Sequence, residues 1–137
     1  MNEVATKEND QLIIREMLED KRILIVDDDD DYAEALDEVF TLQGCHVTRI
    51  TDPVSALGCV LASHYDLIIV DKNMPRVDGI EFAQQVRQQK PNSNIVLITA
   101  YPDDLSRKRS LDVGIRYYLS KPFRKNDILE ACSFLFL

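Results

Sequence analysis

The sequence predicts an α/β protein in which five parallel strands alternate with five helices, a (βα)5 arrangement with helices on both faces of one sheet. Three short runs are continuously apolar apart from Arg22 at the start of the first, namely residues 22–26, 67–70 and 95–98. Strands that are apolar at every position, rather than at every second one, are typical of a sheet covered on both faces. Segments with helical spacing separate these runs, so the sheet is predicted to be parallel and doubly wound.

Residues 1–20 are predicted to be an N-terminal extension, and residues 21–137 a single folded domain. The extension is mixed and acidic and lacks the apolar region of a signal peptide. A short helix over 9–20 is compatible with the spacing of its apolar residues, which are Leu12, Ile13, Met17 and Leu18.

The first half of the domain is predicted to supply two strands and two helices. The run RILIV over 22–26 is the first strand, and 46–50 is a weaker second one. Gly44 ends the helix between them, and Asp52 with Pro53 begins the next helix as N-cap and first-turn proline. The apolar residues expected to face the core are Tyr32, Ala35, Leu36, Val39 and Phe40 in the first helix and Leu57, Val60 and Leu61 in the second.

The second half is predicted to continue the alternation with three strands and three helices. The strands are predicted over 67–70, 95–98 and 117–119. The helix after the first of them has its buried face at Ile80, Phe82, Ala83 and Val86. The other two helices are predicted over 105–113, closed by Gly114, and over 126–137. The helix over 105–113 differs from the others because it is polar and basic. Its few apolar residues predict loose packing.

Composition and charge exclude several classes of protein. The 137 residues are 45% hydrophobic and 29% charged, which is enough for one globular core. The apolar runs are far shorter than the ~20 residues that span a bilayer, so no membrane partner is predicted. The formal net charge of −8 argues against direct binding of nucleic acid. The cysteines Cys45, Cys59 and Cys132 lack metal-ligand spacing and predict reduced core thiols in a cytoplasmic protein.

Charged and hydroxyl side chains follow the predicted strands, where ligands of parallel sheets bind. Asp27 and Asp28 follow the first strand, Asp71 the third, Thr99 the fourth and Lys121 the fifth. Crowded carboxylates repel each other unless they are protonated or bind a cation, and oxygen-only ligands favour Mg²⁺. A carboxylate nucleophile, a divalent cation, an ammonium and a hydroxyl are the groups needed to take up a phosphoryl group.

Each of these residues also has a purely structural interpretation. The acidic run over 29–31 is typical of a solvated first helical turn, with Asp30 or Asp31 as N-cap. Thr99 alone fits a strand residue, and Lys121 alone fits an exposed lysine. Their joint placement at strand ends is what favours a functional site.

Four segments together resemble the signatures of the response-regulator receiver domain of two-component signalling. They are ILIVDDDDDY, DLIIVDKNMPRVDGIE, VLITAY and YYLSKPF, and they occur in the family's order over residues 21–137. The resemblance implies a flavodoxin-like fold with strand order 2-1-3-4-5 and a cis bond between Lys121 and Pro122. It also implies a phosphoprotein that catalyses its own phosphorylation and dephosphorylation.

The resemblance assigns the acceptor and metal site position by position. Asp71 would accept the phosphoryl group. Asp28 and Asp71 would bind Mg²⁺ directly, with the backbone carbonyl of Asn73 as a third ligand and Asp27 acting largely through water. Lys121 would pair first with Asp71 and then with the phosphoryl group.

Further positions carry the response that the resemblance implies. The Thr99 hydroxyl would bind a phosphoryl oxygen, and the Tyr118 ring would change orientation with it. The backbone N–H groups of Lys72 and Ala100 would donate to the other phosphoryl oxygens. Phosphorylation would then switch the face made by the fourth helix, the fifth strand and the fifth helix.

The resemblance also implies partners. A sensor histidine kinase or a histidine phosphotransferase of a phosphorelay would donate the phosphoryl group. Residues 1–100 carry a net charge of −10 and residues 101–137 one of +2. An output partner or a self-dimer is therefore expected at a basic face made by Arg107, Lys108, Arg109, Arg116, Arg124 and Lys125.

Three alternatives fit the residues less well. A haloacid-dehalogenase-type phosphatase would use Asp27 and Asp29, but it leaves Asp71 unexplained and has Asp31 where a threonine or valine is usual. An EF-hand would place its acids correctly, but Tyr32 stands where the loop needs glycine. A receiver-shaped interaction domain that is never phosphorylated does not account for the complete acceptor set.

Overall fold

A computed structural model describes residues 3–137, with side chains from Lys7 onward. Its elements in chain order are α1 (Glu3–Leu18), β1 (Arg22–Val26), α2 (Asp30–Thr41), β2 (His46–Ile50), α3 (Pro53–Ala62), β3 (Leu67–Asp71), β4 (Asn73–Met74), β5 (Val77–Asp78), α4 (Gly79–Gln89), β6 (Ile95–Thr99), α5 (Asp104–Val113), β7 (Tyr117–Ser120) and α6 (Lys125–Phe134). The predicted strands and helices are all present. The short hairpin of β4 and β5 was not predicted.

The five long strands form one parallel sheet in the order β2-β1-β3-β6-β7. This is the predicted order 2-1-3-4-5 once the hairpin strands are left out of the count. Val26 at the end of β1 is in register with Ile50 of β2 and Val70 of β3. The strand order reverses at β1 and β3, so the C-terminal ends of these two strands are where a ligand site is expected.

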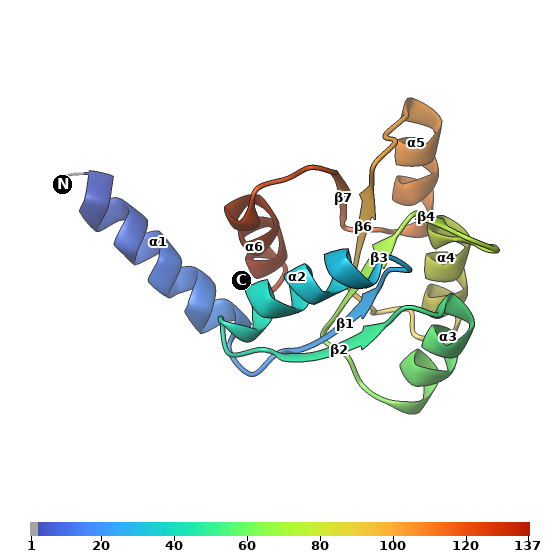
Figure 1. The fold of residues 1–137 in the computed structure, drawn as a ribbon, viewed down its shortest axis with the longest axis horizontal. Coiled ribbons are helices and arrows are strands. Elements are labelled where there is room, and N and C mark those ends of the chain that lie inside the picture. The colour runs from blue at the N-terminus through green and yellow to red at the C-terminus, as the bar shows by residue number, and fades with distance from the viewer. Residues whose placement is uncertain (1–2) are drawn as a thin grey trace.

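Helices cover both faces of the sheet (Figure 1). On one face α2 and α6 pack with Ile23 and Ile25, and on the other α3 and α4 pack with Leu24 and Val26. Successive residues of β1 therefore enter different cores, which explains why the strand is apolar at every position from Ile23 to Val26. α5 lies beside α4 on the second face.

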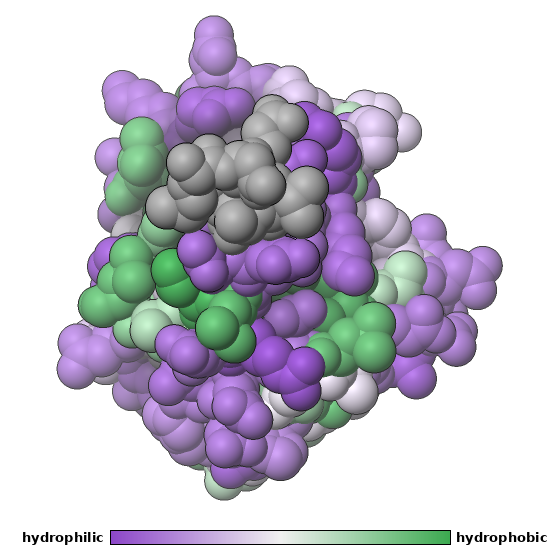
Figure 2. Space-filling model, turned by 90° about the vertical axis from the view of Figure 1, so that its left-hand side faces the viewer, coloured by the Kyte–Doolittle hydropathy of each residue, from purple (hydrophilic) through white to green (hydrophobic). Residues whose placement is uncertain are grey.

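The N-terminal extension is helical, but it is longer than predicted and buries different residues. α1 projects from the body of the domain (Figure 1) and begins before the predicted range of 9–20. Ile14 and Leu18 are buried near α6, whereas Leu12 and Ile13 are exposed. The side from which α1 projects is mainly hydrophilic with separate hydrophobic patches (Figure 2). None of the helices within residues 3–137 has the length and apolarity to cross a bilayer.

Two further helices differ from prediction in the residues that they bury. In α2, Ala33 is buried and Ala35 is exposed, and in α3, Ala56 is buried while Leu61 is exposed. Alanine allows a helix backbone to approach a sheet closely, so the size of an apolar side chain does not by itself predict burial. α6 ends at Phe134, before the predicted end at 137.

Four helices begin at an aspartate. Asp29, Asp52, Asp78 and Asp103 accept hydrogen bonds from first-turn N–H groups of α2, α3, α4 and α5. These N–H groups have no partner within their helix, so each carboxylate stabilises a helix start. The N-cap of α2 is therefore Asp29, and the acids that follow it lie in the first turn instead of capping it as predicted.

The three cysteines are free thiols. Cys45 and Cys132 are buried, as predicted for core residues, whereas Cys59 is only half-buried. Burial raises the pKa of the Cys45 thiol to about 12, so this thiol stays protonated at neutral pH.

Candidate functional site

Three carboxylates meet at the C-terminal ends of β1 and β3. Asp27 follows β1 directly and Asp71 is the last residue of β3, the neighbouring strand. Asp27 is fully buried and Asp71 is 5% exposed, whereas Asp28 is exposed at the rim. One oxygen from each carboxylate lies within 4.8 Å of the others. The structure thus brings together the acids that the sequence placed at these strand ends.

Backbone N–H groups orient the two buried carboxylates. The N–H of Asp29 donates to Asp27 Oδ1 at 3.0 Å, and that of Asn73 donates to Asp71 Oδ1 at 3.2 Å. Burial and the charge of Asp27 raise the pKa of Asp71 to about 6, although Lys121 opposes the shift. Burial and the neighbouring carboxylate both disfavour the charged form of Asp71, so a further positive charge nearby would stabilise it.

Lys121 supplies one positive charge just after β7. Its Nζ lies 3.3 Å from Asp27 Oδ2 and 3.8 Å from Asp71 Oδ2. The peptide bond between Lys121 and Pro122 is cis, as the resemblance implied. The expected ion pair between Lys121 and Asp71 is therefore present, and Asp27 is the nearer partner.

The acidic cluster fits a hard divalent cation. Its oxygen atoms are the ligands that Mg²⁺ prefers, and the exposed position of Asp28 gives access to the water that Mg²⁺ retains. One ammonium does not balance three carboxylates, so a cation held by Asp27, Asp28 and Asp71 would complete the charge of the site.

Thr99 lies at the end of β6 and is fully buried. Its hydroxyl donates to Asn73 Oδ1 at 2.8 Å and accepts a hydrogen bond from the N–H of Tyr101 at 3.0 Å. Thr99 is thus tied to the loop that follows Asp71. The resemblance implied a role for the backbone carbonyl of Asn73, and the link through its side chain was not predicted.

The two backbone N–H groups predicted as donors, those of Lys72 and Ala100, differ in their surroundings. The N–H of Lys72 donates to the Ile98 carbonyl at 2.8 Å, which extends the sheet by one bond. This N–H is therefore engaged, and the N–H that reaches Asp71 is that of Asn73. Ala100 lies exposed at the rim directly after β6.

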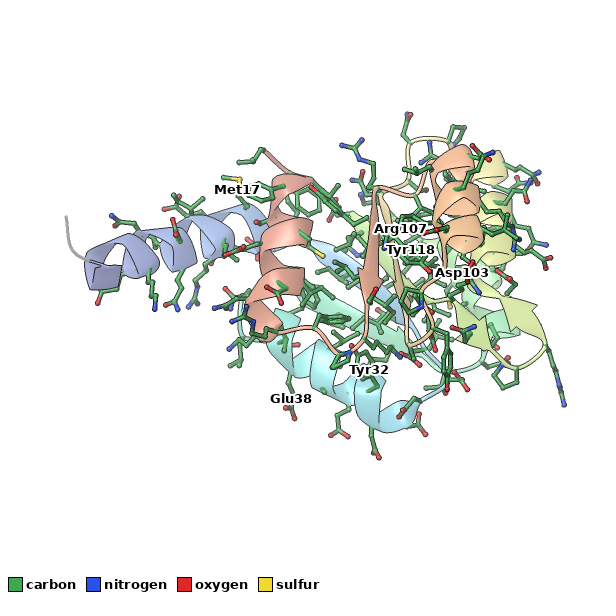
Figure 3. The ribbon with its side chains drawn as sticks, turned by 90° about the horizontal axis from the view of Figure 1, so that it is seen from above. Met17, Tyr32, Glu38, Asp103, Arg107 and Tyr118 are labelled. Carbon is green, nitrogen blue, oxygen red and sulfur yellow. The ribbon has the colours of Figure 1, made fainter. Side chains whose placement is uncertain are left out.

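Tyr118 on β7 is half-buried and held by two contacts from the α5 side. Its hydroxyl accepts a hydrogen bond from the N–H of Asp103 at 3.4 Å. The guanidinium of Arg107 lies 4.8 Å from the centroid of its ring. Figure 3 shows these three residues together between β7 and α5. The position of Tyr118 is thus linked to that of α5.

Two residues of the site were not predicted. The Tyr32 ring centroid lies 3.9 Å from Lys121 Nζ, and burial with the charges of Asp27 and Asp71 raises the pKa of Tyr32 above its usual range. At Gly79 a Cβ atom would overlap the Asp71 carbonyl oxygen. The sequence shows Gly79 only as a member of the segment DLIIVDKNMPRVDGIE, and the close approach to Asp71 is seen only in the structure.

Comparison with known proteins identifies the fold and the family. The family model described as response regulator receiver domain matches residues 23–133. The chain is 35% identical over 108 residues to the response regulator MprA of Mycobacterium avium, which covers 79% of this chain and 47% of MprA. The chain thus spans about half the length of the curated relatives that it matches.

Solved structures agree with this match. The chemotaxis protein CheY4 of Vibrio cholerae is 26% identical with a TM-score of 0.80, over 85% of this chain and 98% of CheY4. The response regulator TrrA of Thermotoga maritima, solved in complex with Mg²⁺-BeF, is 32% identical with a TM-score of 0.77, over 84% of this chain and 98% of TrrA. With the strand order and the strand-end residues described above, these matches show that the chain belongs to the response regulator receiver domain family of two-component signalling.

Proposed function

We propose that this receiver domain accepts a phosphoryl group on Asp71, with Mg²⁺ held by Asp27, Asp28, Asp71 and the backbone carbonyl of Asn73. The observation that carries the proposal is the setting of Asp71, a buried carboxylate among acids with Lys121 Nζ 3.8 Å from its Oδ2. Carboxylates held together in this way are characteristic of functional sites. TrrA, a neighbour in fold, binds Mg²⁺ with BeF.

The residues divide the transfer between them. An Asp71 oxygen attacks the phosphorus while the bond from phosphorus to the donor's imidazole nitrogen breaks, and the imidazole leaves with the electron pair. Lys121 and the N–H groups of Lys72 and Ala100 stabilise the charge on the phosphoryl oxygens, and the N–H of Asn73, which already donates to Asp71 Oδ1, joins them. Bound Mg²⁺ supplies additional positive charge at these oxygens. Water then attacks the phosphorus, the bond from phosphorus to the Asp71 oxygen breaks, and inorganic phosphate leaves as the carboxylate is restored.

Thr99 connects the transfer to a change of conformation. To donate to a phosphoryl oxygen, its hydroxyl must release Asn73 Oδ1, which it holds at 2.8 Å. The loop after β6 moves with Thr99, because the N–H of Tyr101 donates to the same hydroxyl. The contacts of Tyr118 with the Asp103 N–H and with the Arg107 guanidinium then change. The response thus follows from hydrogen bonds that one phosphoryl oxygen rearranges.

Intact-mass analysis tests the assignment of Asp71. Acetyl phosphate with Mg²⁺ should add one phosphoryl group, which is stable in acid and lost in base as expected of an acyl phosphate. Asp71→Asn should remove the adduct completely, and Asp31→Asn, in the exposed acidic run, should leave it intact. An adduct of full stoichiometry in Asp71→Asn would refute the assignment. The haloacid-dehalogenase alternative would instead place the adduct on Asp27, which is fully buried.

The donor and the output partner remain proposals. A sensor histidine kinase or a histidine phosphotransferase is the donor that the family implies, and a cytoplasmic location stays a prediction. The basic face is partly engaged within the domain, because Arg107 stacks on Tyr118 and Arg109 Nη1 lies 3.7 Å from Asp78 Oδ2. Lys108 and Arg116 are exposed, so their side chains are accessible to an acidic partner or to a second copy of the chain.

Reversal of those two charges tests the partner surface. Lys108→Glu with Arg116→Glu should weaken association that depends on phosphorylation, while the rate of Asp71 phosphorylation stays normal. The association should also weaken as salt is raised from 0.05 to 0.5 M, because the distance over which exposed charges interact falls from roughly 14 Å to about 4 Å. Sedimentation velocity measures both effects. Association that survives the substitutions would place the contact elsewhere.

A further inference from the structure

We propose that Tyr32 is a positioning residue that holds the Lys121 ammonium beside the acceptor carboxylate through a cation–π contact. The inference rests on the proposed phosphoryl transfer, in which Lys121 meets the phosphoryl group. The Lys121 Nζ lies 3.9 Å from the Tyr32 ring centroid, well inside the ~6 Å over which an aromatic ring attracts a cation. The side chain of Lys121 is 17% exposed, so the contact is largely shielded from water.

The ring differs in kind from the other two contacts of Lys121. Asp27 and Asp71 attract the ammonium, but both also belong to the acidic cluster that fits a cation. A bound cation shares their negative charge and so weakens their hold on Lys121. The Tyr32 ring has no ligand atom in that cluster. It therefore remains as the contact that fixes the ammonium when the metal is present.

Tyr32 is itself held in place. Its backbone N–H donates to Asp29 Oδ1 at 3.1 Å at the start of α2. Its ring meets the Phe123 ring edge-on, with centroids 6.1 Å apart and planes at 84°. Figure 3 shows Tyr32 between α2 and the segment that joins β7 to α6, where Phe123 lies. The backbone hydrogen bond fixes the start of the side chain, and the Phe123 ring limits the orientations of the Tyr32 ring.

The chain offers a matched control at the other end of the sheet. Arg22, at the start of β1, lies with its guanidinium 5.5 Å from the centroid of the Tyr65 ring. This pair is also a cation over a tyrosine, but it lies at the opposite strand ends from Asp71. Loss of the Tyr65 ring should therefore leave the site unchanged.

The first experiment measures the rate of Asp71 phosphorylation by acetyl phosphate with Mg²⁺. Tyr32→Leu should slow the reaction about tenfold, the size expected when a shielded cation–π contact is lost. Tyr32→Phe, which keeps the ring and removes the hydroxyl, should restore the rate, and Tyr65→Leu should not change it. If Tyr32 acts through Lys121, Tyr32→Leu should have no further effect in a Lys121→Met background. Tyr32→Met replaces Tyr32→Leu if the latter does not fold.

The second experiment needs no phosphoryl donor. The ¹H–¹⁵N signal of an ordered lysine ammonium should be visible for Lys121 in the unmodified protein, lost in Tyr32→Leu and regained in Tyr32→Phe. An unchanged signal and rate in Tyr32→Leu would overturn the inference, as would an equal slowing in the Lys121→Met background. If the unmodified protein forms no adduct on Asp71, the proposed function fails, and the ammonium signal alone then tests the role of Tyr32.

Discussion

α4 and α5 lie side by side on the same face of the sheet, but they are anchored in different ways. α4 buries mainly apolar residues, which are Gly79, Ile80, Phe82, Ala83 and Val86. α5 buries Ser106 and Ser110 instead and leaves Leu105 and Leu111 about 70% exposed. Apolar burial stabilises by roughly 25 cal/mol per Å², so α4 is held much more firmly than α5.

This difference divides the surroundings of the site into two sides. We call the side of α4 the fixed side and the side of α5 the responsive side. α4 begins directly after the acceptor loop, where Gly79 packs against the backbone of Asp71. α5 follows the loop after Thr99 and contacts Tyr118 through Arg107. The proposed acceptor carboxylate thus lies on the firmly packed side, and the residues proposed to respond to it lie beside a helix with little apolar anchoring. A helix with few buried apolar contacts opens or shifts locally at a lower free-energy cost than the rest of its domain.

The largest expected effect is a difference in the free energy of unfolding between a variant of α4 and a variant of α5. Phe82→Ala in α4 removes a side chain that is 2% exposed and should lower the free energy of unfolding by about 3–5 kcal/mol. Leu105→Ala in α5 should change it by less than about 0.5 kcal/mol, because that side chain is already exposed. Urea denaturation measures both values. Equal destabilisation by the two variants would remove the contrast.

The next effect concerns the metal. Asp28→Ala removes one of the proposed direct ligands, and we expect the Mg²⁺ affinity to fall by on the order of 100-fold. Asp30→Ala serves as the control, since Asp30 lies in the same acidic run but in the first turn of α2. Isothermal titration with Mg²⁺ measures both. A normal affinity in Asp28→Ala would exclude Asp28 as a ligand.

A smaller effect follows from the pKa of Asp71. Because this pKa is raised from 3.8 to about 6, the folded protein binds more protons than the unfolded chain between these values, and stability falls as pH rises through this window. Without Mg²⁺, Asp71→Asn should therefore stabilise the fold by about 1–2 kcal/mol at pH 7.5. Most of this gain should vanish at pH 4.5, where Asp71 is already protonated. Thermal unfolding at the two pH values measures the difference. A gain in stability that is independent of pH would argue against a raised pKa of Asp71.

The smallest effect lies in the ion pair that joins the two helices. Arg109 Nη1 lies 3.7 Å from Asp78 Oδ2, the N-cap of α4. Arg109→Gln should cost less than about 1 kcal/mol, because the pair is partly exposed. Hydrogen exchange should nevertheless become faster in α5 than in α4, since α5 has fewer other anchors. Faster exchange in α4 alone would reverse the assignment of the two sides.

The strands and the acidic cluster were predictable because each depends on local pattern and on a general rule about parallel sheets. Continuous apolar runs indicated the three central strands, and the ends of these strands placed Asp27, Asp71 and Thr99 together. The buried face of α1 was not predictable, because hydrophobicity alone does not distinguish Ile13 from Ile14. The contact of Tyr32 with Lys121 joins residues far apart in the chain, and only their packing across α2 and β7 reveals it.

The most direct test of the account is a comparison of ¹H–¹⁵N spectra before and after phosphorylation with acetyl phosphate and Mg²⁺. We expect the shifts away from the loop after Asp71 to concentrate between Thr99 and Tyr118, including α5, while α4 beyond its first turn changes little. In Asp71→Asn the spectrum should not respond to the phosphodonor. Shifts spread equally over α4 and α5, or a full response in Asp71→Asn, would contradict the claim that a phosphoryl group on the fixed side moves the responsive side.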